Sequence, residues 1–267
     1  MSATEQMNTF TNEHYLKDQL RRAKRLQLFG VLSIFLSFFL SFGFGVNYFL
    51  VYLAYPFLLA GLPLWTIGRA TVRRLGMTPR ADHLLTNELK ALNNKHTLHH
   101  YATVGGKTIN HLLIAPAGVL IMQSSESVGP VTCQGGPNGD RWKSKSNILD
   151  RLTGLRPPVG NPTKDLDAAT SVVRQLLTDS GKPNVPVKGL IVFTTNPDLE
   201  IEECTYPAVP LSEVRQATRE LLLDIGGDRA EGSNVDAILT SEDRRRINLA
   251  LSPQAPPVPA KPASAQR

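Results

Sequence analysis

The chain has 267 residues, with 29 Lys and Arg against 23 Asp and Glu, so its formal net charge is +6 and its pI is near 9.4. The hydrophobic fraction of 42% excludes a wholly disordered chain, and a count of two cysteines excludes a small scaffold held by several disulfides. A basic pI favours a nucleic-acid-binding protein only if the basic residues lie on the folded domain.

An uninterrupted apolar segment lies near the N-terminus. Residues 26–67 contain no Asp, Glu, Lys or Arg, and they hold eight of the ten phenylalanines. One membrane crossing takes about 20 apolar residues, and turn-forming residues at 43–47 divide the segment in two. We therefore predict a two-helix transmembrane hairpin over 26–68, with helices at 26–43 and 48–67. A cleaved signal peptide is the alternative, but no small-residue cleavage site precedes the second apolar run.

The flanks of this segment carry the net charge of the chain. Residues 1–25 and 69–80 hold nine basic and three acidic side chains, which accounts for the whole +6, whereas residues 81–267 hold 20 of each sign. Basic flanks stay on the cytoplasmic side, so we predict a multi-pass protein of the inner (cytoplasmic) membrane with both termini in the cytoplasm. The lipid bilayer is then the predicted partner, and charge gives no support for nucleic acid as a partner.

Two features of the membrane region concern packing. Ser33, Ser37 and Ser41 recur at every fourth position, which lets another helix approach closely and favours a protein partner or a homo-oligomer formed through the hairpin. Serines that simply face lipid are the alternative. Within the cytoplasmic segment 1–25, a helical pattern at 9–26 predicts either a juxtamembrane helix near anionic headgroups or a solvated extension of the first membrane helix.

The soluble part begins with an amphipathic helix at 82–93, which has leucines at helical spacing. Short β-type runs between Gly and Pro turns then predict an antiparallel meander at 100–104, 108–114 and 119–123, continued by 128–133 and 141–145. Residues 134–161 are rich in Gly, Pro, Asn and Ser, which predicts a long loop.

Pro162 opens the next predicted helix, which Ser180 and Gly181 close. A buried strand at 187–194 follows, and helices at 211–223 and 240–251 complete the order. We therefore divide the soluble part into a folded domain at 80–225, a helical extension at 226–251 and a disordered tail at 252–267, which is rich in Pro and Ala.

One block of this domain resembles a known family. Residues 109–123 run from Ile-Asn-His through Ala-Pro-Ala-Gly-Val to Met-Gln, and Gly129, Trp142, Asn161 and Pro162 follow. The block is similar to the NERD (nuclease-related) domain, a branch of the PD-(D/E)xK nuclease-like superfamily, and the resemblance covers residues 80–195. It implies an α/β (α+β) fold with a restriction-endonuclease-like α-β-β-β-α-β core in a bacterial protein, and members of this family are often membrane-attached.

The resemblance also assigns functional positions, and this chain departs from the family at most of them. The family has Asp between the Ile and the His, where this chain has Asn110. It has Glu-x-Lys at the end of the following strand, where this chain has Gln123 and Ser125. Asp82 matches the acid expected on the preceding helix, with Glu88 a weaker match, and Asp165 stands where the family has Gln.

These exchanges decide the expected function. Phosphodiester hydrolysis in the family uses two carboxylates to hold Mg²⁺ and a lysine to position water. Asn110 and Gln123 keep the shape of the acids but lose both negative charges, and Ser125 loses the positive charge. Glu126 is a candidate for a migrated acid, although its place past the strand end also fits an exposed loop. We therefore predict a catalytically inactive, membrane-anchored binding or scaffold module with no cofactor.

Two other functions stay open. A nuclease with a rearranged site would hold Mg²⁺ between Asp82, Glu126 and Asp165, and it requires these carboxylates to lie within about 5 Å of one another. A nucleic-acid-binding protein that does not cleave is the second. It would gather four basic side chains on one face, namely Lys107, Arg141, Lys143 and Lys145.

The remaining clusters predict no site. Four histidines lie between positions 96 and 111, but no Cys or carboxylate stands at the spacing of a zinc site. The arginine run at 244–246 follows two acids and fits a solvated helix face. Cys133 and Cys204, 71 residues apart, are expected to be isolated, reduced thiols of a cytoplasmic domain.

Overall fold

The structure of the protein is a computed structural model. The model describes residues 7–42, 48–76, 79–127, 129–137, 139–145, 159–227 and 238–251. Several predicted segments lie wholly or partly outside these residues, among them the turn at 43–47, half of the loop at 134–161, part of the helical extension at 226–251 and the tail at 252–267.

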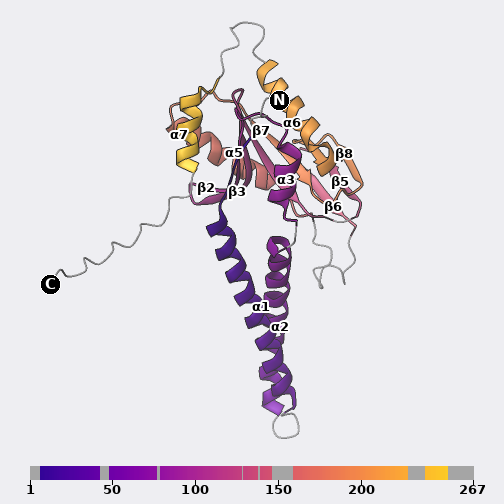
Figure 1. The fold of residues 1–267 in the computed structure, drawn as a ribbon. Coiled ribbons are helices and arrows are strands. Elements are labelled where there is room, and N and C mark those ends of the chain that lie inside the picture. The colour runs from indigo at the N-terminus through magenta and orange to yellow at the C-terminus, as the bar shows by residue number, and fades with distance from the viewer. Residues whose placement is uncertain are drawn as a thin grey trace, which may run out of the picture.

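Two long helices extend together from an α/β domain (Figure 1). They are α1, Glu13–Phe42, and α2, Tyr48–Gly76. The two helices are antiparallel, because Gly30 of α1 lies against the backbone of Trp65 and Gly61 of α2, while Gly68 of α2 lies against the backbone of Gln27 of α1. A Cβ built on Gly68 would lie 2.6 Å from the nitrogen of Gln27. Ser33 donates a hydrogen bond of 2.7 Å to the carbonyl of Phe57. Small residues therefore bring the two backbones together, and Ser33 takes part in packing.

Helix α1 is the one helix among the described residues that is long and apolar enough, by length and composition, to cross a membrane. It begins later than the helical pattern at 9–26 predicts. The Asn12 side chain accepts from the nitrogen of Tyr15 at 3.0 Å, as an N-cap residue does. The residues before this cap form a short strand, β1, Asn8–Thr11. Residues 13–26 thus form the first part of α1 rather than a separate juxtamembrane helix.

A six-stranded mixed sheet forms the centre of the domain, in the order β1-β2-β3-β4-β7-β9. Strands β2, β3 and β4 are antiparallel neighbours, whereas β1 on β2, β7 on β4 and β9 on β7 are parallel. Their bounds are Thr97–Val104 for β2, Lys107–Ile114 for β3, Val119–Ser125 for β4, Val187–Phe193 for β7 and Ala208–Pro210 for β9. The mixed α/β class predicted from the sequence is confirmed.

Helices cover both faces of this sheet. Helix α3, Ala81–Leu89, and helix α6, Val214–Gly227, which follows a short 3-10 turn η2 at Leu211–Glu213, pack on one face. Helix α5, Pro162–Asp179, and helix α7, Ser241–Leu251, pack on the other. Alternate residues of β4 divide between the two cores, because Leu120 and Met122 face α3 while Val119 and Ile121 face α5.

A separate three-stranded sheet has the order β6-β5-β8. Its strands are β5, Val131–Gln134, β6, Arg141–Ser144, and β8, Leu199–Glu202. The prediction that the runs at 128–133 and 141–145 continue the central meander is therefore wrong. Strand β5 pairs instead with β6 and with β8, which lies more than 60 residues further along the chain. Alternation of apolar and polar residues indicates a strand, but it does not determine which strand pairs with it.

Candidate functional site

The family positions on β3 and β4 lie next to each other in the sheet. His111 pairs with Met122 in the antiparallel register, so Asn110 and Gln123 are the next residues along the two strands. All three positions that replace the family's charged residues, Asn110, Gln123 and Ser125, are half-buried. Gln123 and Ser125 alternate with Ser124 and therefore share the face of Ile121, which α5 covers.

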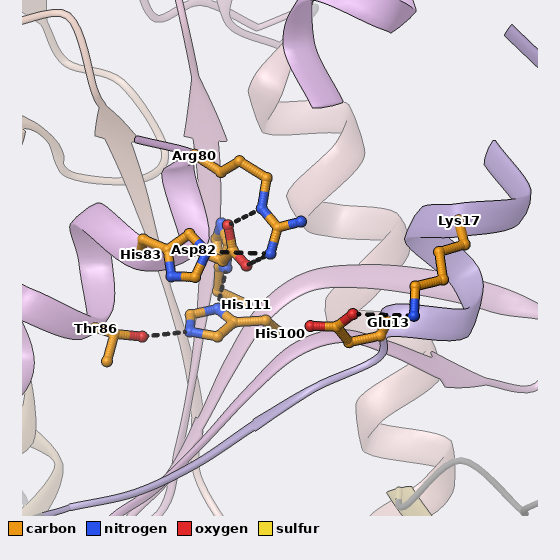
Figure 2. Close-up of polar contacts among 8 residues, drawn as sticks. All are labelled: Glu13, Lys17, Arg80, Asp82, His83, Thr86, His100 and His111. Carbon is orange, nitrogen blue, oxygen red and sulfur yellow. Dashed lines mark hydrogen bonds and ion pairs between the residues drawn. The ribbon is translucent and has the colours of Figure 1, made fainter. Parts of the chain in front are cut away.

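Asp82 lies in the first turn of α3 and is 1% exposed. Arg80 donates to both oxygens of the Asp82 carboxylate, from Nε at 3.1 Å and from Nη2 at 2.9 Å (Figure 2). The same Nη2 lies 3.2 Å from Nε2 of His83. Arg80 occupies the extended N-cap position of α3, which sets its side chain beside the first helical turn. From the sequence, Arg80 is expected only as a basic flank of the membrane segment, so its pairing with Asp82 was not predicted.

The two other acids proposed for a rearranged site lie on separate elements. Glu126 directly follows β4, and Asp165 lies in the first turn of α5. Burial raises the pKa of both carboxyls, and the positive charge of Arg74 opposes that rise in each pKa. Arg74 belongs to the last turn of α2. The positive charge that acts on Glu126 and Asp165 therefore comes from α2, whereas the family has a lysine at position 125.

A buried chain of four polar side chains crosses from α3 to β4. The Nδ1 atoms of His100 and His111 are 2.6 Å apart, so one of them donates and the other accepts. Thr86 lies 2.9 Å from Nε2 of His100, and Ser124 lies 3.1 Å from Nε2 of His111. Figure 2 shows the Thr86 end of this chain beside Asp82. Every ring nitrogen of His100 and His111 therefore has a hydrogen-bond partner, and these buried polar atoms are satisfied without a metal ion.

Burial keeps this histidine pair neutral. It lowers the pKa of His100 to about 4 and lowers the pKa of His111 well below its usual range. The sequence placed both histidines in a local cluster without a zinc site, and the structure gives them a direct mutual contact. Strand pairing of His100 with His111 produces it, and only knowledge of the register could have predicted it.

The residues at the family positions do not fit Mg²⁺. A divalent ion takes oxygen ligands and is held by carboxylates, whereas these positions offer two neutral amides, a hydroxyl and an acid already paired with Arg80. Among the described residues, one group of three or more His, Cys, Asp and Glu side chains has ligand atoms within 4.8 Å of one another, namely Cys133, Asp140 and Cys204. The acids Asp82, Glu126 and Asp165 form no such group.

The two cysteines correct a prediction. Cys133 and Cys204 are joined in a disulfide, with Cα atoms 6.4 Å apart, so they are not isolated thiols. Cys133 belongs to β5, and Cys204 lies in the segment between β8 and β9. Their contact depends on the parallel pairing of β5 with β8, which local patterns do not reveal.

A family model described as NERD, nuclease-related domain, matches residues 80–194, and this match is consistent with a PD-(D/E)xK-like nuclease family. No curated protein and no solved structure matches the chain significantly.

Proposed function

We propose that this chain is a membrane-anchored protein whose NERD domain does not hydrolyse nucleic acid and serves as a cytoplasmic binding or scaffold module. The observation that carries the proposal is the pairing of Asp82 with Arg80 in a domain whose other family positions have lost their charges. The one acid retained at a family position has both oxygens engaged by a guanidinium group.

The charge balance supports this proposal. A bound Mg²⁺ is stabilised by anionic oxygen ligands, which offset the loss of its hydration shell. Asn110 and Gln123 supply no negative charge, and Ser125 supplies no positive charge for water activation. Recruiting Asp82 as a ligand would leave the Arg80 guanidinium without its partner. Loss of ion binding and loss of charge stabilisation therefore coincide at one site.

The apolar surface of α1 and α2 supports membrane anchoring. Phe39 on α1 is 69% exposed and Leu59 on α2 is 71% exposed, and many other large apolar side chains of both helices face outward. A continuous apolar surface of this extent is typical of a lipid-facing segment. We propose that both helices cross the inner membrane and that their basic flanks keep both termini in the cytoplasm. The helix pair could also hold a second copy or a protein partner.

A cleavage assay tests the absence of hydrolysis. The full-length chain, purified in detergent, is incubated with single-stranded and double-stranded DNA and with Mg²⁺ or Mn²⁺. We expect no metal-dependent product above that of a mock preparation. Cleavage that the Asp82→Asn variant abolishes would contradict the proposal and favour the rearranged nuclease. Cleavage that the variant retains would point to a contaminant.

One observation favours binding of nucleic acid without cleavage as a second candidate. A cavity of about 560 Å³ beside the small sheet is lined by Trp142, Lys143 and Lys145, which offer a stacking surface and two cations. Glu200 lines the same cavity and opposes an anionic ligand. Lys107, in contrast, opens β3 of the central sheet. DNA binding that weakens with salt and with Lys143→Gln would support this candidate, and binding that ignores salt would remove it.

A further inference from the structure

The two cysteines of this chain meet although nothing in their sequence context brings them together. The Cys133 and Cys204 residues are the only cysteines among the 267 residues. They are joined across 71 positions, with a Cα separation inside the range that a disulfide accepts. Disulfides of cytoplasmic proteins are typically transient, catalytic or redox-sensing rather than structural.

We propose that Cys133 and Cys204 form a reversible oxidation site, in which a peroxide-class oxidant makes the disulfide and a dithiol reductant breaks it. This inference rests on the cytoplasmic placement of the domain proposed above. It is independent of whether the NERD domain cleaves nucleic acid.

The two sulfur atoms differ in access, which assigns their roles. Cys133 is fully buried, whereas Cys204 is half-buried and lies between two neighbouring elements of the small sheet and the central sheet. An oxidant in solution therefore reaches Cys204 first. Glu202 and Glu203 directly precede Cys204, and an Asp140 oxygen lies within 4.8 Å of both sulfurs. These carboxylates repel anionic oxidants such as glutathione disulfide, but they do not repel neutral hydrogen peroxide.

The chemistry balances with hydrogen peroxide as the oxidant. The Cys204 thiolate attacks one peroxide oxygen, the O–O bond breaks, and Cys204 sulfenic acid and hydroxide form. The Cys133 sulfur then attacks Cys204 Sγ, the S–O bond breaks, and water leaves with the Cys133 proton as the disulfide forms. In reduction, a dithiol attacks Cys204 Sγ and releases Cys133 as a thiolate. Its second thiol then completes the exchange and leaves the reductant as a disulfide.

The oxidation site lies against a wall of the 560 Å³ cavity. Cys133 pairs with Trp142 across β5 and β6, and Trp142 lines that cavity. Trp142 also donates to Thr163 at 2.8 Å, and its ring packs against Phe193 at 6.0 Å between centroids. In the reduced state β5, which pairs with the strand that carries Trp142, loses its covalent link to the β8–β9 segment. The state of the cysteine pair therefore sets the rigidity of the cavity wall.

Noncovalent contacts hold the same segment when the disulfide is open. Asp140 accepts hydrogen bonds from the nitrogen and the hydroxyl of Thr205, and from the hydroxyl of Thr163 at 2.6 Å. These contacts tie the residue after Cys204 to the start of α5. The two sulfurs therefore stay near each other after reduction, and re-oxidation does not require the domain to refold.

The first experiment follows the cysteine pair in cells. Cells that express the full-length chain are quenched with acid before and after a peroxide pulse, and free thiols are labelled with a maleimide that adds mass. We expect two labelled thiols at rest and none after the pulse. A pair that is oxidised at rest, or one that peroxide leaves reduced, overturns the proposal.

In parallel, Cys204 of the Cys133→Ser variant is labelled in intact cells with a membrane-impermeant maleimide. Labelling there contradicts the cytoplasmic placement, whereas labelling only after lysis supports it.

The second experiment uses the purified full-length chain in detergent. The Trp65→Phe variant leaves Trp142 as the one tryptophan, and a neighbouring disulfide quenches indole emission. Reduction should raise Trp142 emission and lower the unfolding temperature by about 10 °C, because the bond closes a long loop. The Cys204→Ser variant should emit like the reduced chain under both conditions. Equal emission and equal unfolding temperature in oxidised and reduced wild type would refute the coupling to the cavity wall. If Cys133→Ser misfolds, Cys204→Ser and the wild-type comparison still decide the question.

Discussion

Arg80 and Asp82, separated by one residue, form a two-point ion pair at the start of α3, with contacts of 3.1 and 2.9 Å. Removing the cation leaves the buried Asp82 carboxylate without its ion-pair partner, so Arg80→Gln should destabilise the full-length chain by about 2 kcal/mol. This loss is smaller than the loss expected for a fully buried ion pair, because Arg80 is partly exposed. Asp82→Asn should cost less, because a neutral amide leaves no buried charge. Thermal unfolding in detergent measures both. Arg245→Gln, on an exposed face of α7, is the matched control and should leave the unfolding temperature unchanged. An unaffected Arg80→Gln variant would contradict the role given to this pair.

The histidine pair predicts a loss of stability in mild acid. In the unfolded chain a histidine has a pKa near 6.5, whereas burial lowers the pKa of His100 to about 4 in the folded domain. The unfolded state therefore binds more protons between these values, and stability falls as the pH drops from 6.5 towards 4. The His100 contribution to this loss is about 3 kcal/mol. Chemical denaturation at a series of pH values measures it.

A matched variant isolates the effect of the pair. His100→Gln keeps a hydrogen-bonding side chain but has no titrating proton, so the decline between pH 6.5 and 4 should become shallower. His14→Gln changes a histidine at the exposed start of α1 and should leave the decline as it is. Identical pH profiles for wild type and His100→Gln would refute the assignment.

The contact of α1 with α2 depends on glycine. A Cβ at Gly30 would clash with the backbone nitrogen of Trp65 and lie 2.9 Å from the Gly61 carbonyl, so Gly30→Leu should separate the helices. We expect a lower unfolding temperature in detergent and a loss of cross-links between the two helices. Gly76→Leu is the control, because a Cβ at Gly76 meets nothing within 4 Å. Equal cross-linking in both variants would contradict this packing.

Arg74 links α2 to the acids near the family positions. Its positive charge opposes the rise of the pKa of Glu126 and of Asp165, so Arg74→Gln should raise the pKa of both carboxyls further. Carboxyl carbon shifts in an NMR titration of the detergent-solubilised chain measure this change. Arg69→Gln serves as the control, because Arg69 lies over the Trp65 ring at 5.3 Å. Unchanged titration of both acids in Arg74→Gln would separate α2 from the site.

Local signals predicted several elements closely. The sequence marks the start of α5 by Pro162 at the first helical position, and the structure adds an Asn161 side chain that accepts from the nitrogen of Lys164 at 3.1 Å. The continuous apolar run at 187–194 became the central strand β7, which is buried by helices on both faces. The mixed α/β class followed from such patterns, whereas the NERD match followed from the resemblance of the block at 109–123 to that family.

The parts that the sequence missed depend on contacts between distant segments. Strand β1 joins the sheet edge beside β2, and β5 leaves the meander to pair with β8. The same pairings create the disulfide and the contact of His100 with His111. For Asp82, the sequence identified the acid but not its state, because the partner Arg80 was assigned to the membrane flank. The ion pair of Asp82 depends on the fold at the start of α3, which residue type alone does not reveal.

The most direct test of the proposed loss of metal binding is a calorimetric titration of the full-length chain with Mg²⁺ and Mn²⁺. The wild type is compared with a variant that restores the family residues, Asn110→Asp with Gln123→Glu and Ser125→Lys. We predict no binding of either ion to the wild type and measurable binding to the restored variant. Stoichiometric binding to the wild type that Asp82→Asn abolishes would contradict the central claim.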